Sequence, residues 1–115
     1  MVIKETPLHR EAVRGGAGSV DFYYAVPKEM CDDYMRMFAR LDINPLSSIG
    51  RHQHVGETEP YYILSGEGIF IDNDGNRTPV RRGDVCIIRE GDFHAIENPS
   101  ETEILSLMAV IYKQD

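Results

Sequence analysis

Three histidines and one glutamate are spaced so that they can converge on a single metal ion. His52 and His54 are one residue apart, and in an extended strand residues i and i+2 point to the same side. Glu59 precedes the apolar run 61–64 and can bring a carboxylate to the same point, while His94 lies in a second glycine-containing stretch downstream. Three imidazoles and one carboxylate suit one divalent transition metal, and this ligand set is compatible with Mn, Fe, Ni, Co or Zn.

Two other side chains bear on this assignment. Glu57 has the same strand parity as Glu59, so alternation by itself leaves the choice of carboxylate open. His9 lies in a polar N-terminal segment without a ligand partner nearby in the sequence, and we interpret it as a surface residue.

The spacing of these residues resembles the two sequence motifs of the cupin family. Residues 50–66 resemble the first motif through His52, His54, Glu59 and Gly66, and residues 83–98 resemble the second through Gly83, Gly91, His94 and Asn98. The sequence departs from the pattern at two places, because Gly50 stands only two residues before His52 and Arg89 replaces the proline of the second motif. The spacing to Gly66 favours Glu59 over Glu57 as the ligand, and we therefore expect Glu57 to be solvated.

The resemblance spans residues 35–112 and implies an all-β fold, a double-stranded β-helix or small jelly-roll barrel. It also implies that the metal lies inside the barrel, towards one open end. We expect one domain over residues 1–115, with an N-terminal extension at 1–34 and the motif-bearing barrel at 35–112.

The hydrophobic pattern predicts many short strands and no long helix. In residues 35–43, Met35, Met37, Ala39, Leu41 and Ile43 alternate with polar or exposed positions, which favours a half-buried strand over the alternative, a helix. The following Asn44-Pro45 supports this choice. Strands are also predicted at 2–4, 20–26, 61–64, 68–72, 78–80, 85–88 and 102–112, with a loop at 45–50 and turns at 15–18, 27–33, 72–76, 81–84 and 90–93.

Composition narrows the class of protein and its partners. A chain of 115 residues has room for one core, and a net charge of −7 argues against nucleic acid or an anionic membrane surface as a partner. Cys31 and Cys86 lack metal-type spacing, so a reduced cytoplasmic chain is our interpretation and one disulfide is the alternative. The N-terminus lacks the apolar region of a signal peptide, and the apolar run 104–112 is too short to span a bilayer.

Open metal positions permit catalysis, and the resemblance implies a metal-dependent enzyme acting on a small oxygen-rich molecule, as a dioxygenase, a decarboxylase or an isomerase. The alternative is a non-catalytic module or sensor that binds a small ligand such as a sugar or an organic acid, since fold does not fix function. A purely structural metal is a third interpretation, although structural sites tend to be closed. We favour the enzyme because a sensor would need a DNA-binding segment to transmit its signal, and the sequence shows none.

Few other residues suggest a catalytic or ligand-binding role. Tyr61 shares strand parity with Glu59 and is a candidate pocket hydroxyl, with simple packing as the alternative. Arg36 and Arg40 share a strand face on which an arginine can pair with a ligand carboxylate, although a solvated or interface face is the simpler interpretation. Acidic surroundings, including Glu57, Glu67 and Asp92, argue against a highly charged anionic ligand unless Arg40 reaches the pocket.

The predicted assembly is a homodimer. In small cupins, N-terminal segments such as residues 1–34 often pair with the sheet of a neighbouring subunit. The apolar strand predicted at 104–112 would also require cover from solvent.

Overall fold

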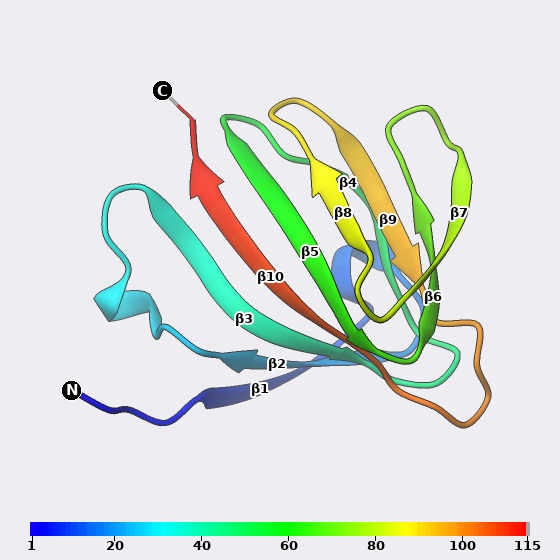
Figure 1. Cartoon of the computed structure of the whole chain (residues 1–115), viewed down its shortest axis with the longest axis horizontal. Helices are drawn as coiled ribbons and strands as arrows, with labels where there is room; N and C mark the ends of the chain where they lie inside the picture. Colours follow the sequence, from blue (N-terminus) through cyan, green and yellow to red (C-terminus); the bar gives the residue numbers. More distant parts are fainter. Residues whose placement is uncertain (115) are drawn as a thin grey trace.

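The protein is an antiparallel β-sandwich that closes into a small barrel (Figure 1). The computed structural model describes residues 1–114, and in them the chain forms ten strands and two single-turn 3₁₀ helices. One sheet has six strands in the order β1-β2-β3-β10-β5-β8, and the other has four in the order β4-β9-β6-β7. The strands are β1 (Thr6–Glu11), β2 (Ser19–Tyr24), β3 (Met35–Ile43), β4 (Ser48–Gln53), β5 (Glu57–Ser65), β6 (Glu67–Ile71), β7 (Arg77–Arg81), β8 (Val85–Ile88), β9 (Phe93–Glu97) and β10 (Leu105–Lys113), and the 3₁₀ helices are η1 (Val13–Gly15) and η2 (Lys28–Met30).

The core lies between the two sheets and is filled by alternate residues of their strands. Leu107 of β10 and Ile63 of β5 face inward from the larger sheet, and Ile96 of β9 and Phe70 of β6 face them from the smaller one. This alternation is what the sequence pattern predicts for strands buried on one side. The all-β, double-stranded β-helix prediction is confirmed.

The strand prediction at residues 35–43 is confirmed at both ends. β3 pairs with β10 on one side and with β2 on the other, so the helical alternative is wrong. The prediction at 85–88 also has the right bounds, but β8 is an edge strand in which Val85 and Ile87 are exposed while Cys86 and Ile88 are buried.

Several predictions near the N-terminus and the motifs are wrong. The first strand is β1, not residues 2–4, and it joins the larger sheet by pairing with β2. The predicted loop at 45–50 is too long, because strand β4 already begins at Ser48, and β9 was missed altogether. Both strands are short and interrupted by polar ligand residues, so neither has a clean period of two.

The last strand, β10, lies in the middle of the larger sheet and not at an edge. It hydrogen-bonds with β3 and with β5, and it begins at Leu105, three residues later than predicted. Its backbone therefore needs no cover from another subunit, and that part of the argument for a dimer is wrong. None of the helices in residues 1–114 has the length and hydrophobicity that crossing a bilayer requires.

Candidate metal centre

Four side chains from both sheets meet inside the barrel. His52 lies on β4, His54 directly follows it, Glu59 lies on β5 and His94 lies on β9. One potential ligand atom from each of the four lies within 4.8 Å of the others. His54, Glu59 and His94 are buried, whereas His52 is partly exposed. The structure thus brings together all four residues that the sequence predicted as ligands.

A β-bulge in β4 turns His52 towards this cluster. Ile49 pairs with Ile96 and His52 pairs with His94, so β4 spans three residues where β9 spans two. An extra residue of this kind bends a strand and re-aims a side chain. Because of the bulge, Ile49 can fill the core while His52 and His94 face each other, with their Nε2 atoms 3.0 Å apart.

Hydrogen bonds on the outer ring nitrogens orient two of the imidazoles. His52 Nδ1 lies 2.7 Å from the carbonyl oxygen of Gly50, and His54 Nδ1 lies 2.7 Å from Glu57 Oε1. Both acceptors lack a proton, so each Nδ1 donates, and the Nε2 atoms are directed at the centre of the cluster. Partners of this type fix the tautomer that metal-ligating histidines use.

Glu57 is not solvated, and that prediction is wrong. Its carboxylate accepts hydrogen bonds of 2.6 Å each from Nε and Nη2 of Arg36, in addition to its bond with His54. Glu57 therefore lies between an arginine and a histidine of the cluster. Hydrogen bonding to Arg36 lowers the pKa of Glu57 to about 2, with His54 contributing in the same direction.

The protonation states in the absence of metal follow from burial and from the two carboxylates. Burial lowers the pKa of His52 to about 4 and also lowers the pKa of His94. Burial opposes the charge of His54 too, but its neighbours Glu59 and Glu57 outweigh burial and raise the pKa of His54. For Glu59, burial is likewise outweighed by the nearby His54 and His94, which lower the pKa of this carboxyl.

The four side chains of the cluster cannot all be satisfied by hydrogen bonds to one another, whereas a bound cation would satisfy them. His54 Nε2 lies 3.0 Å from His94 Nε2, and two such nitrogens can share only one proton. Glu59 Oε1 is 2.9 Å from His54 Nε2, yet it is buried and receives no hydrogen bond of acceptable geometry. Such unpaired buried atoms are costly unless another group binds them, and a divalent metal ion can bind all four residues.

The cluster opens into a cavity of about 410 Å³ that is large enough for a small ligand. Tyr61 lines this cavity as alternation predicted, and its ring centroid lies 5.4 Å from that of His94. Complete burial raises the pKa of Tyr61 well above its usual value, so its hydroxyl keeps its proton at neutral pH.

The cavity is lined by basic side chains that the sequence analysis did not identify as a group. Four basic residues, Arg10, Arg14, Lys28 and Arg36, line it together with two acidic ones, Glu29 and Glu59. No sequence motif relates these basic residues, because they come from separate turns and strands that only the fold brings together. The acidic residues that argued against a highly charged anionic ligand, Glu57, Glu67 and Asp92, are not among the residues that line this cavity.

Arg36 reaches the cavity through a second β-bulge. Met37 pairs with Ile111 and Met35 with Tyr112, which leaves Arg36 as an extra residue in β3. A bulge changes the direction of the side chain, so Arg36 lines the cavity while it stays exposed to solvent, as the alternation-based interpretation predicted.

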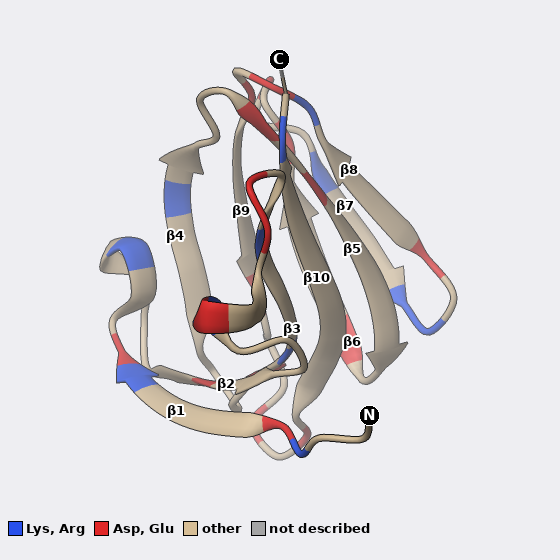
Figure 2. Cartoon of the chain, turned by 90° about the vertical axis from the view of Figure 1, so that its left-hand side faces the viewer, with Lys and Arg blue, Asp and Glu red and all other residues tan. Residues whose placement is uncertain are grey.

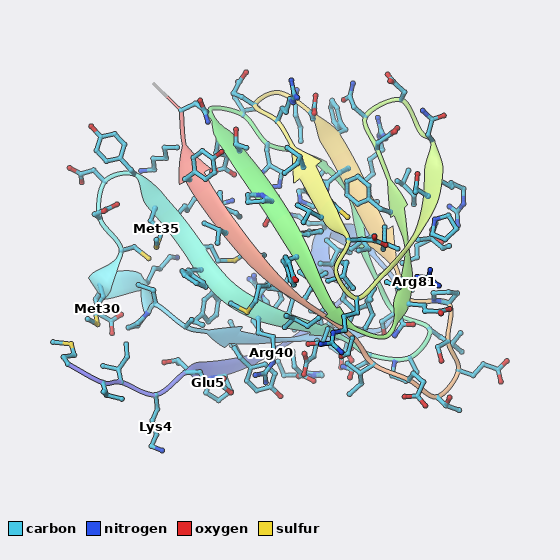
Figure 3. The ribbon with its side chains drawn as sticks, in the orientation of Figure 1. Lys4, Glu5, Met30, Met35, Arg40 and Arg81 are labelled. Carbon is cyan, nitrogen blue, oxygen red and sulfur yellow. The ribbon has the colours of Figure 1, made fainter. Side chains whose placement is uncertain are left out.

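Arg40 is not among the residues that line the cavity, and Figure 3 shows it near Glu5, beside β1 and β2. It lies on the outer side of the sheet, 3.3 Å from Glu5 and 3.3 Å from Asp42, with its guanidinium carbon 4.2 Å from the ring centroid of Tyr23. Strand parity applies to Arg40 because no bulge lies beside it. His9 is exposed on β1 and contacts Asp21 and Glu11, away from the metal cluster.

Asn98 links backbone segments that lie far apart in the sequence. Its buried side-chain amide donates to the carbonyl oxygens of Ile43, Asn44 and Glu103, at 2.8 to 3.1 Å. These bonds tie the end of β3 to the connection between β9 and β10. Asn98 is thus a structural residue of the second motif.

Comparison with known proteins identifies the class. Residues 39–111 match the family model described as a cupin domain, which is most of the chain. The protein therefore belongs to the cupin domain family, as the two motifs predicted.

Individual proteins and structures similar to this chain give a more specific comparison than the family does. The chain is 41% identical over 114 residues to an oxalate-binding protein of Thermotoga maritima, and the match covers 96% of this chain and 93% of that protein. The crystal structure of a predicted oxalate decarboxylase from Thermotoga maritima superposes with a TM-score of 0.90 at 42% identity, covering 98% of this chain and 99% of the other. A polyketide cyclase from Streptomyces resistomycificus has a TM-score of 0.74 at 18% identity, covering 100% and 79% of the two chains, and shares the fold alone.

Proposed function

We propose that His52, His54, Glu59 and His94 bind one divalent transition metal ion, which can be Mn, Fe, Ni, Co or Zn. The observation that carries this proposal is that one ligand atom from each of the four residues lies within 4.8 Å of the others, and that Glu59 offers a buried carboxylate oxygen with no hydrogen bond. Such an ion would act as a Lewis acid for a ligand bound at its free positions. The protein supplies the neutral imidazoles of His52 and His94 and the ionised Glu59.

The ligand we propose is a small carboxylic acid, with oxalate as the first candidate. Basic residues outnumber acidic ones in the cavity lining, although the whole chain carries a net charge of −7. This local excess of positive charge favours an anion. The relatives named above as an oxalate-binding protein and a predicted oxalate decarboxylase support the same chemical class.

Binding without turnover and catalysis are two separate functions of such a site. The position of Tyr61 favours catalysis, because this tyrosine lines the cavity beside the cluster and its hydroxyl keeps its proton. Decarboxylation of the oxalate dianion takes up one proton and yields formate and CO₂. Dioxygenase and isomerase activities on other oxygen-rich acids are the further enzymatic candidates, and a ligand-binding or sensor module is the alternative.

The metal assignment is tested by elemental analysis of protein purified without chelator. Wild type should contain near one metal ion per chain, and His52→Ala and His94→Ala should lose most of it while retaining the β-sheet spectrum. Metal-free wild type that takes up none of the five candidate ions would refute the assignment.

Function is tested by incubating each metal-loaded protein with oxalate, with and without O₂, and analysing the mixture by mass spectrometry. Formate and CO₂ in equal amounts would establish decarboxylation. Oxalate that raises the melting temperature but is recovered intact under every condition would establish the binding module.

We also propose that the protein is a homodimer, because of an exposed apolar face and not because its last strand needs cover. The outer side of the larger sheet carries an apolar face formed by Val85, Ile87, Pro60, Tyr62, Met108, Val110 and Phe38, which are neighbours in the strand register. Tyr62, Val85 and Ile87 are each about half exposed, and apolar faces of this kind mark interfaces.

For the cellular location we propose the cytoplasm. Cys31 and Cys86 are free thiols that form no disulfide with each other, which supports a reducing compartment.

A further inference from the structure

The basic residues of the cavity differ in whether they already have a partner. Arg36 is held by Glu57, and Arg10 lies with its guanidinium carbon 5.9 Å from the ring centroid of Phe22. The ion pairs that arginines form within residues 1–114 involve Arg36, Arg40 and Arg77, and none involves Arg14. Arg14 is therefore a cation at the cavity that is available for a ligand.

The backbone around Arg14 is held in an unusual conformation. Arg14 has φ 53° and ψ 33°, and Ala12 has φ 49°, which is the left-handed region that side chains other than glycine seldom adopt. Strained residues of this kind are retained where surrounding contacts hold them, and they cluster at functional sites. Val13, between them, packs against the core and anchors the turn.

Two glycines allow η1 to lie in close contact with β4, the strand that carries His52. A Cβ atom added at Gly16 would lie 2.3 Å from the carbonyl oxygen of Ser48, and one added at Gly50 would lie 2.2 Å from the carbonyl oxygen of Arg14. The backbone of η1 thus lies directly on the bulge of β4. Figure 2 shows this basic turn beside β4, next to the end of β1.

Arg14 also lines the same cavity as two of the proposed metal ligands, His52 and Glu59. A guanidinium at this cavity stabilises a negative charge placed there.

We propose that Arg14 is a specificity-determining residue, held by η1 at the cavity so that its guanidinium binds a carboxylate of the ligand. This inference rests on the proposed function, and it assigns the preference for anionic over neutral ligands to the N-terminal segment. The motif-bearing barrel supplies the metal ligands, whereas Arg10, Arg14 and Lys28 all come from residues 1–34.

The test is calorimetric titration of Mn-loaded protein with oxalate and with oxamide, its neutral diamide. Arg14→Gln removes the charge and should weaken oxalate binding by about tenfold to a hundredfold, the loss expected for one charge-assisted hydrogen bond. Oxamide binding should change little, and Arg14→Lys should retain part of the oxalate affinity. The Mn content should equal that of wild type, because Arg14 is not a ligand.

Two further variants separate the position of Arg14 from its charge. Gly16→Ala keeps the arginine but displaces η1 from β4, so it should weaken oxalate binding in the same direction, and combining it with Arg14→Gln should add little. Arg82→Gln, in the exposed turn between β7 and β8, is the matched control and should bind as wild type does.

The outcomes distinguish this inference from the proposed function. If wild type binds Mn and oxalate but Arg14→Gln binds oxalate equally well, or loses oxamide to the same extent, the role of Arg14 is refuted and the proposed function stands. If wild type takes up none of the five candidate ions and binds no oxalate, both are refuted. A selective loss of oxalate at unchanged Mn content establishes the inference.

Discussion

Glu57 links the metal cluster to a charged residue outside it. Its carboxylate accepts from Arg36 on one side and from His54 Nδ1 on the other. A carboxylate in this position makes the opposite ring nitrogen a better electron donor and fixes the ring orientation. Glu57 is therefore a positioning residue, although it contacts no ligand atom of the proposed metal.

At the residue scale, we predict that Glu57→Gln weakens metal affinity by about tenfold to a hundredfold, because outer hydrogen-bond partners of histidine ligands have effects of this size. Competition with a chromophoric chelator measures the affinity. Glu101→Gln, in the exposed connection between β9 and β10, is a control with the same loss of charge. An affinity of Glu57→Gln equal to that of wild type would show that Arg36 and Glu57 have no part in the metal site.

The same residue gives a pH prediction for stability. Because the pKa of Glu57 is about 2 in the folded protein and ordinarily 4.5, its ionised form stabilises the fold fully above about pH 4.5. That contribution is lost as the pH falls from 4.5 towards 2. The difference in the free energy of unfolding between wild type and Glu57→Gln, measured with urea on metal-free protein, should shrink over this range, and a constant difference would contradict the prediction.

His54 provides a second pH effect, on metal affinity. Its pKa is raised from the ordinary 6.5 by Glu59 and Glu57 against the effect of burial, so a proton competes with the metal for this imidazole at pH values around and above 6.5. We predict that metal affinity falls by up to about tenfold per pH unit as the pH decreases through this range. Titrations between pH 8 and 6 measure the slope, and a pH-independent affinity would contradict the competition.

At the scale of elements, close backbone contacts position the strands that carry the ligands. Gly66, between β5 and β6, has φ +80°, and a Cβ atom there would lie 2.4 Å from the carbonyl oxygen of Ile104. Gly83 has φ +90° but nothing within 4 Å of an added Cβ. Gly66 and Gly83 thus share a backbone conformation but differ in their surroundings.

This contrast predicts different costs for the same substitution. Gly83→Ala should destabilise the protein by about 1 kcal/mol through backbone strain alone. Gly66→Ala should cost about 3 kcal/mol, because a clash with the carbonyl oxygen of Ile104, just before β10, is added to the strain. Urea denaturation of metal-free protein measures both, and equal losses would show that the contact with Ile104 relaxes without cost.

At the scale of the whole molecule, the apolar outer face of the larger sheet decides the predicted assembly. β10 is covered by β3 and β5, so the surface that needs a partner is the side-chain face containing Tyr62, Val85 and Ile87, not a strand edge. A sheet that is apolar on both faces is unusual for a monomer in water.

We predict that light scattering on wild type gives twice the chain mass of 13.0 kDa. Ile87→Glu should give the mass of one chain, because it places a charge in the centre of the apolar face. Ile104→Glu, an exposed apolar position outside that face, is the control and should remain dimeric. A wild type that is monomeric at micromolar concentration would refute the dimer.

The sequence by itself determined the fold class and which four side chains meet in the candidate metal centre. Strand alternation in residues 35–43 and the spacing of His52, His54, Glu59 and His94 are local patterns, and the backbone geometry of a strand converts them directly into positions. The same alternation placed Tyr61 inside. These predictions required no knowledge of which strands pair.

Only the tertiary structure decided what surrounds the cluster. Strand alternation placed Arg36 on the outer face, but a bulge turned it inward, where its pairing with Glu57 gives that carboxylate a role that strand parity did not predict. Arg14 reaches the cavity on η1, which packs on β4 through Gly16 and Gly50, and Arg10 and Lys28 reach it from β1 and η2. Bulges and contacts between distant segments depend on how the sheets close around the core, so no local pattern in the sequence records them.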